Sequence, residues 1–207
     1  MGIIKTLKGI TPKFGKNCYV AEGACVIGDV TMGNDCSVWF NAVLRGDVHF
    51  IKIGNRVNIQ DCCCLHTLSG KAPVILEDDV TIGHHVTLHG CVVHKNALVG
   101  MGSTVLDFAE IGEGAIVAAG ALVLKNTVIG PGELWGGVPA RFIKQVNPEL
   151  AASLNQSYAQ HYVDNIPVYR EADANPETTK HCFRIAAVLG RSKSTRLNSS
   201  HGKLSRM

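Results

Sequence analysis

Three features of the sequence predict an all-β chain whose short strands stack into a parallel β-helix of triangular section. Large apolar residues recur every six positions, small or β-branched residues stand two positions before them, and the chain combines 22 Gly residues with only 6% aromatic residues. With 207 residues, of which 46% are hydrophobic, the chain is long enough for one sizeable core. This composition excludes an extended disordered chain and a coiled coil.

The six-residue period runs from residue 20 to residue 129 with three breaks: a three-residue insertion, a longer insertion around residues 67–74, and a one-residue deletion. Counted across the breaks, eighteen successive positions are apolar, which has a random probability on the order of 10⁻⁶ at this composition. The eighteen positions are Val20, Val26, Met32, Val38, Leu44, Ile53, Ile59, Leu65, Leu76, Ile82, Leu88, Val93, Val99, Val105, Ile111, Val117, Val123 and Ile129.

The positions two residues earlier in each unit carry no charge, and in an extended segment they share a face with the large apolar residue. Each unit is therefore interpreted as a short strand with one large and one small inward residue. A glycine stands at or near many of the corners that follow, as at Gly54, Gly83 and Gly100. Because no unit can bury its apolar side alone, we expect three units per coil and six to seven coils within residues 1–141.

A different pattern follows the repeat. Asn147 is suited to cap a helix, Pro148 fits its first position, and apolar residues then recur at helical spacing until Pro167, which is expected to end the helix. A second, weaker helix is expected over residues 176–189. We assign residues 142–190 to a C-terminal helical segment that packs on the β-helix.

The formal net charge of +3 comes from the end of the chain. Residues 191–207 hold five basic residues and no acidic one, which leaves 15 basic against 17 acidic residues elsewhere. We interpret this basic tail as disordered and foreign in origin, and we expect no nucleic-acid partner. No apolar run is long enough to span a membrane, and the start lacks a signal-peptide pattern, so we expect a cytoplasmic protein without membrane contact.

The eight cysteines do not form a CxxC zinc pair. Two of them, Cys62 and Cys64, are expected to point outward. Four fall at the small inward positions of the repeat, where a thiol acts as a small hydrophobic group: Cys18, Cys36, Cys63 and Cys91.

Three histidines around the long insertion are the candidate chemical groups. If the insertion leaves the β-helix between two corners, His89 returns one coil above His66, about 4.8 Å along the axis, whereas His84 lies on another corner. One chain cannot easily bring the three together. A threefold assembly can place His84 of a neighbour beside His66 and His89.

Several stretches carry a resemblance to a known family: RGDVHFIKIGNRVNIQDCCCLH, TIGHHVTLHG and ALVGMGS. Over roughly residues 10–165 the chain resembles the γ-class carbonic anhydrases, which are hexapeptide-repeat proteins with a left-handed β-helix, and their relatives linked to phenylacetate and carnitine pathways. The left hand of the β-helix is expected from this resemblance alone.

The resemblance implies a homotrimer with a metal ion at each subunit interface, bound by His66 and His89 of one subunit and His84 of the next. It implies that three charged residues hold the interface: Arg45, Asp47 and Asp61. It also implies three further residues near the metal: Asn58, Gln60 and Tyr162, the last from the helix.

A metal held by three imidazoles with an open position makes hydroxide available at neutral pH, which would attack CO₂ to give bicarbonate while Gln60 orients it. Zn²⁺ is the expected metal, and Fe²⁺ or Co²⁺ also suits imidazole. No CoA or other organic cofactor is assigned. Val48 follows Asp47, and the loop after His66 has no carboxylate, so we expect slow hydration unless His49 or His85 carries the proton.

Two other functions fit the same repeat. CoA-dependent acyltransferases and thioesterase-like relatives share the β-helix and the ending GxPA[KR], which here is Gly137 to Arg141. A nonenzymatic metal-binding accessory subunit is the third possibility. Metal content distinguishes the acyltransferase and thioesterase-like functions from the carbonic anhydrase hypothesis.

Overall fold

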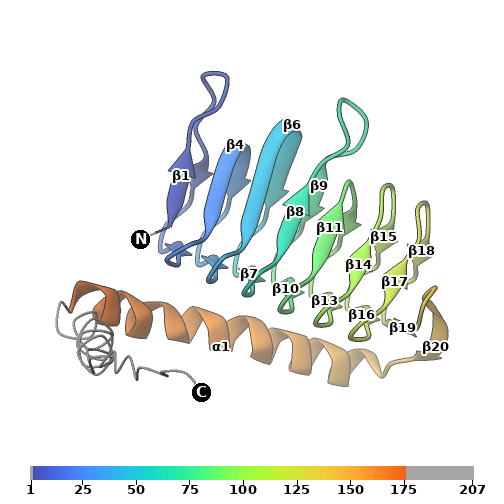
Figure 1. Ribbon diagram of the computed structural model, residues 1–207. Coiled ribbons are helices and arrows are strands. Elements are labelled where there is room, and N and C mark those ends of the chain that lie inside the picture. The colour runs from blue at the N-terminus through green and yellow to red at the C-terminus, as the bar shows by residue number, and fades with distance from the viewer. Residues whose placement is uncertain (1, 176–207) are drawn as a thin grey trace, which may run out of the picture. The chain divides into compact units, whose positions relative to one another are not determined.

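The computed structural model describes residues 2–175, in which twenty strands precede one long helix (Figure 1). The strands follow one another as a parallel β-solenoid, with three short strands in each regular coil and one coil stacked on the next. Seven of the strands on one face are parallel, which gives about seven coils. The predicted fold class is confirmed: an all-β fold, in which six-residue repeats form a parallel β-helix, with an α-helix at the C-terminal end.

The first face is a sheet of eight strands, in which the last pairs antiparallel to its neighbour and the others are parallel. Its strands are β3 (Tyr19–Val20), β5 (Ser37–Val38), β7 (Asn58–Ile59), β10 (Thr81–Ile82), β13 (Leu98–Val99), β16 (Ile116–Val117), β19 (Glu133–Gly136) and β20 (Arg141–Gln145).

The other two faces form one sheet of twelve strands, because β4 (Cys25–Met32) and β6 (Val43–Ile53) continue around the corner between them. The second face adds β1 (Ile3–Lys5), β8 (Cys64–His66), β11 (Thr87–His89), β14 (Thr104–Val105) and β17 (Leu122–Val123). The third face adds β2 (Lys13–Phe14), β9 (Val74–Leu76), β12 (Val92–Val93), β15 (Glu110–Ile111) and β18 (Val128–Ile129).

The large apolar residues of the repeat fill the interior of the solenoid. Seventeen of the eighteen predicted positions are buried, and the remaining one, Val20, packs half-buried against the same core near its first coil. Three of the four predicted core thiols, Cys36, Cys63 and Cys91, are buried, whereas Cys18 is half-buried against the same core. Cys62 and Cys64 are exposed, as predicted.

The solenoid extends beyond both ends of the six-residue period, which runs from residue 20 to residue 129. Strands β1 and β2 pair with β4 before the first predicted unit, and the turn between Leu7 and Ile10 breaks the six-residue period that would have revealed them. At the other end, Trp135 of β19 still pairs in parallel register with Val117, although the sequence pattern has already faded.

Helix α1 (Pro148–Ala174) begins as predicted, with the Asn147 side chain accepting a hydrogen bond from the Glu149 amide at 2.9 Å. The prediction that Pro167 ends the helix is wrong: a proline lacks one N–H and removes a single hydrogen bond, and the helix continues for seven residues. The predicted second helix, over residues 176–189, and the tail lie outside the described residues.

The chain divides into two compact units, residues 1–168 and 169–207. Within the first unit, the helix lies beside the solenoid (Figure 1). Asn155 donates to the Asn96 carbonyl at 2.6 Å, and Ile166 packs with Tyr19 and Trp39. Among residues 2–175, no helix is both long and apolar enough to cross a bilayer.

The buried thiols give this fold an expected pH dependence. Burial raises the pKa of Cys63 and of Cys91 to about 12. Between the ordinary thiol pKa and about 12, the unfolded chain loses protons that the folded chain keeps, so the free energy of unfolding falls as the pH rises.

We expect Cys91→Ala to reduce the slope of unfolding free energy against pH by up to about 1.4 kcal/mol per pH unit in this range. Urea unfolding between about pH 8 and pH 11 measures that slope, with the exposed Cys62→Ala as the matched control. Equal slopes in the wild type and Cys91→Ala would contradict the expectation.

Candidate metal centre

Two of the three candidate histidines meet at one corner of the solenoid. His66 ends β8 and His89 ends β11, and the two residues are direct partners in the parallel register of these strands. Their ring centroids lie 5.1 Å apart, and Nδ1 of His66 lies 3.0 Å from Nε2 of His89. The predicted stacking of His89 on His66 is therefore confirmed.

Each of these rings contacts a carboxylate through its other nitrogen. Nε2 of His66 lies 2.9 Å from Oδ1 of Asp47, and Nδ1 of His89 lies 2.6 Å from Oδ1 of Asp107. An ionised carboxylate can only accept, so the contacting nitrogen of each ring carries the hydrogen. In the neutral rings, Nδ1 of His66 and Nε2 of His89 are then the atoms that bear lone pairs.

These two lone pairs face each other across 3.0 Å, which is an unfavourable contact unless a proton or a cation lies between the rings. Two imidazole nitrogens bound to one tetrahedral zinc ion at 2.0–2.1 Å are about 3.3 Å apart. Metal-binding histidines also commonly donate their second N–H to a carboxylate. The donor set at this corner thus fits two ligands of an imidazole-bound divalent metal.

Arg45 forms an ion pair with the Asp47 carboxylate that contacts His66. Burial disfavours the charge on Asp47, but hydrogen bonds from His66 and Arg45 outweigh that cost and lower its pKa. Asp47 therefore stays ionised and keeps accepting from His66. The predicted interface role of Arg45 and Asp47 stays a prediction, whereas within one chain the two residues hold the His66 ring through the Asp47 carboxylate.

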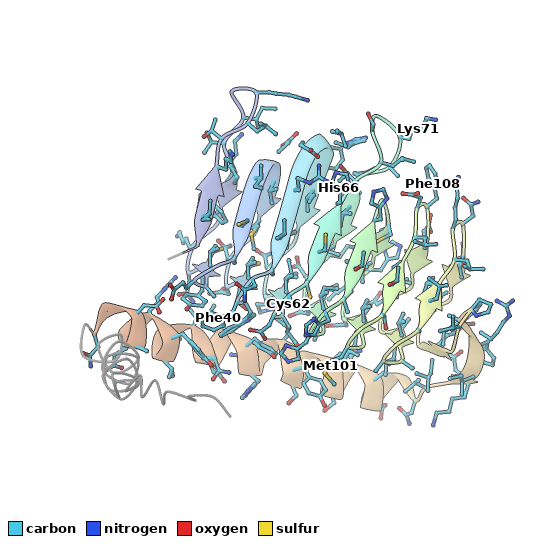
Figure 2. All side chains as sticks on the ribbon, in the orientation of Figure 1. Phe40, Cys62, His66, Lys71, Met101 and Phe108 are labelled. Carbon is cyan, nitrogen blue, oxygen red and sulfur yellow. The ribbon has the colours of Figure 1, made fainter. Side chains whose placement is uncertain are left out.

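His84 lies on a different corner, as predicted. The amide of His85 donates to the Asp61 carbonyl, and the amide of Gly102 donates to the His84 carbonyl, so this corner stacks coil upon coil. Cys62 and Met101 belong to the coils on either side of His84. Figure 2 shows both residues near the helix and His66 at the edge away from it. Nδ1 of His84 lies 2.7 Å from Oδ2 of Asp61, the third histidine–carboxylate pair of the set.

Within residues 2–175, no three His, Cys, Asp or Glu side chains come together as a metal site. One chain therefore assembles two of the three predicted ligands and holds the third elsewhere. This outcome agrees with the register argument that one chain cannot easily bring the three histidines together.

A cavity of about 520 Å³ adjoins His84, between the first face and the helix. It is bordered by Gln60 and Tyr162, two of the predicted catalytic residues, and by apolar side chains that include Leu98 and Met101. The third, Asn58, is buried: its amide nitrogen donates to Thr81 Oγ1 at 2.9 Å, and its carbonyl oxygen accepts from Gln60 Nε2 at 3.0 Å. Asn58 thus fixes the Gln60 amide at the cavity wall.

Aromatic packing holds the Tyr162 side chain at the wall of the cavity. Its ring packs edge-on against Trp39 at a centroid distance of 5.3 Å, and the Trp39 indole donates to the Ser37 hydroxyl.

The two candidate proton carriers, His49 and His85, differ in their hydrogen bonds and exposure. His49 accepts from the Phe50 amide through Nδ1, whereas His85 stands exposed at a corner with positive φ.

Two residues that contact the candidate site were not predicted: Asp107, which contacts His89, and Thr81, which accepts from Asn58. The signal for Asp107 was present in the sequence, because the one-residue deletion shortens this coil to 17 residues and so puts Asp107 above Gly90, next to His89. The signal for Thr81 was weaker, since a threonine in a strand has many roles.

The chain is similar in sequence to hexapeptide-repeat proteins and to proteins named carbonic anhydrase. The family model for the bacterial transferase hexapeptide, with six repeats, matches residues 90–125. A protein of Geobacillus kaustophilus named carbonic anhydrase is 48% identical over 168 residues, which cover 81% of this chain and 91% of that protein. The mitochondrial gamma carbonic anhydrase 1 of Arabidopsis thaliana is 44% identical over 170 residues, covering 80% of this chain.

The chain spans only 62% of the length of that Arabidopsis relative. Among solved structures, a Bacillus cereus protein with a provisional acetyltransferase assignment aligns with a TM-score of 0.78 and 44% identity. That alignment covers 82% of this chain and 97% of the other.

Proposed function

Because the chain belongs to the γ-carbonic anhydrase family, we propose that it is a metal-dependent carbonic anhydrase that converts CO₂ reversibly to bicarbonate. We propose further that each active site is shared between two subunits of a homotrimer. His66 and His89 of one subunit and His84 of the next would hold the metal. Zn²⁺ is the proposed metal, with Fe²⁺ and Co²⁺ as the alternatives that imidazole ligands also suit.

The observation that carries this proposal is the pair of histidine nitrogens that face each other 3.0 Å apart, each with its other nitrogen on a carboxylate. His84 has the same kind of carboxylate partner on a separate corner. Because two of these histidines share one corner and the third lies on another, a neighbouring subunit in a threefold assembly can supply the third to the first two.

When bound, a divalent metal with an open position lowers the pKa of water to about 7 and so supplies a nucleophile at neutral pH. The residues of the chain then have separate tasks. Asp47, Asp61 and Asp107 hold the three rings in the tautomer that leaves a lone pair free.

Gln60 would orient the reacting molecules at the wall of the cavity beside His84. Its amide has a second N–H and a carbonyl oxygen beyond the bond to Asn58, so it can both donate and accept. Asn58 keeps that amide in place through Thr81. Tyr162 and the apolar side chains of the cavity would exclude water and admit a small apolar substrate such as CO₂.

Proton release is the expected slow step. The described loop after His66, residues 67–73, contains no carboxylate. We propose His49 or His85 as the group that passes the proton to solvent, because an imidazole can take up a proton at one ring nitrogen and release one from the other. The predicted cytoplasmic location stays a prediction, and the Arabidopsis relative is named as mitochondrial.

Acyl transfer is the second candidate, favoured by the provisional acetyltransferase assignment of the Bacillus cereus structure, which is 44% identical. The segment from Gly137 to Arg141 also matches the ending of hexapeptide acyltransferases. One experiment separates the two activities.

The full chain is stripped of metal with a chelator, reloaded with Zn²⁺, Co²⁺ or anaerobic Fe²⁺, and assayed for CO₂ hydration by stopped flow and for acetyl-CoA consumption. We expect about one metal ion per subunit and hydration above the buffer rate that disappears on chelation and returns on reloading. Stoichiometric metal without hydration, or metal-independent acetyl-CoA consumption, would contradict the proposal.

A further inference from the structure

Asp107 occupies a defined place above the corner that carries His89. Leu88 pairs with Val105 in the parallel register of β11 and β14, which puts Asp107 one coil above Gly90. The backbone of this corner is held on both sides: the Phe108 amide donates to the Gly90 carbonyl at 2.7 Å, and the Asn126 amide donates to the Asp107 carbonyl at 3.0 Å.

The space that the Asp107 carboxylate fills exists because residue 90 is glycine. A Cβ atom at Gly90 would lie 2.6 Å from Oδ1 of Asp107 and 2.9 Å from Cβ of Ala72. Gly90 also has a φ of 54°, in the left-handed region that favours glycine. The corner is therefore shaped to bring a carboxylate against Nδ1 of His89, at 2.6 Å.

The contact with Asp107 determines which ring nitrogen of His89 carries the hydrogen. A carboxylate that only accepts holds the hydrogen on Nδ1 and leaves the lone pair on Nε2, the atom that lies 3.0 Å from His66. Without this partner, a neutral imidazole exchanges between its two tautomers, and its ring is free to turn about the terminal side-chain torsion.

We propose that Asp107 is a positioning residue that sets the tautomer and ring orientation of His89, and that Gly90 provides the space for it. The proposal rests on the proposed function, since it treats His89 as a metal ligand. Asp107 itself touches neither substrate nor the reacting atoms.

The test uses Asp107→Ala, Asp107→Asn and the control Glu110→Gln, which changes an exposed carboxylate in the next strand. The first readout needs no metal: nitrogen NMR of the His89 ring in the metal-free full chain. We expect the Nδ1–H tautomer in the wild type, in the control and in Asp107→Asn, whose amide oxygen still accepts, and a tautomer mixture in Asp107→Ala.

The second readout is Zn²⁺ affinity by competition with a chelator. We expect a loss of about 10-fold to 100-fold for Asp107→Ala and a smaller loss for Asp107→Asn. The variant Gly90→Ala, which keeps the carboxylate but removes its space, is expected to weaken affinity as well. Circular dichroism and size-exclusion chromatography confirm that each variant folds and assembles as the wild type does.

An unchanged tautomer and an unchanged Zn²⁺ affinity in Asp107→Ala would overturn the proposal. A wild type that binds no Zn²⁺ would instead overturn the proposed function, and the metal-free NMR measurement would still decide whether Asp107 orients His89. The two failures are thus distinguishable.

Discussion

Replacing His89 with alanine is expected to remove the bound metal and to lower CO₂ hydration by at least about two orders of magnitude, because the loss of a ligand costs more than the 10-fold to 100-fold effect of losing its hydrogen-bond partner. His89 supplies one of the two nitrogens that face each other at the corner of β8 and β11. Metal analysis of the purified variant and stopped-flow hydration measure both effects.

His94→Ala is the matched control for this variant. His94 also contacts a carboxylate, with Nδ1 lying 3.1 Å from Oε1 of Glu77, but it belongs to the third face beside β12. It should leave metal content and hydration unchanged. Full metal retention in His89→Ala would remove that residue from the ligand set.

Replacing His84 with alanine is expected to cause a loss of metal and of CO₂ hydration as large as that in His89→Ala, although His84 lies on another corner of its own chain. The reason is that a neighbouring subunit would complete the site with this residue. The variant should keep the oligomeric state of the wild type, because the three charged residues proposed at the interface remain.

Metal content, hydration rate and molecular mass in solution are measured together for His84→Ala. A variant that keeps stoichiometric metal and activity would mean that His84 is not a ligand. A variant that loses both while remaining assembled supports the shared site.

The fold could be predicted from the sequence because stacking imposes one apolar residue on every six-residue unit. Val26, Leu44 and Leu65 fill equivalent places in successive coils, so their spacing reports the coil directly. The period fails where the chain leaves the coil, which is why it does not reveal strands β1 and β2, although both lie within the predicted β-helix of residues 1–141. The length of helix α1 was missed because a proline removes one hydrogen bond without necessarily stopping a helix.

The site could be predicted only in part. The stacking of His89 on His66 follows from the corner register alone, and so does the separation of His84. The carboxylate partners depend on side-chain conformations that spacing does not define, so Asp107 was missed and Asp47 was given only an interface role. The relation of His84 to the other two histidines depends on a second chain.

The most direct test of a metal site shared between two subunits is to mix two inactive variants. His84→Ala chains keep His66 and His89, whereas His89→Ala chains keep His84. Random reassembly of equal amounts into trimers creates intact sites at about one quarter of the interfaces, because each interface needs one chain of each kind in one order. We therefore expect hydration to return to about one quarter of the wild-type rate on mixing. No recovery in mixed trimers, with their hybrid composition verified by mass spectrometry, would contradict a metal site built from two subunits.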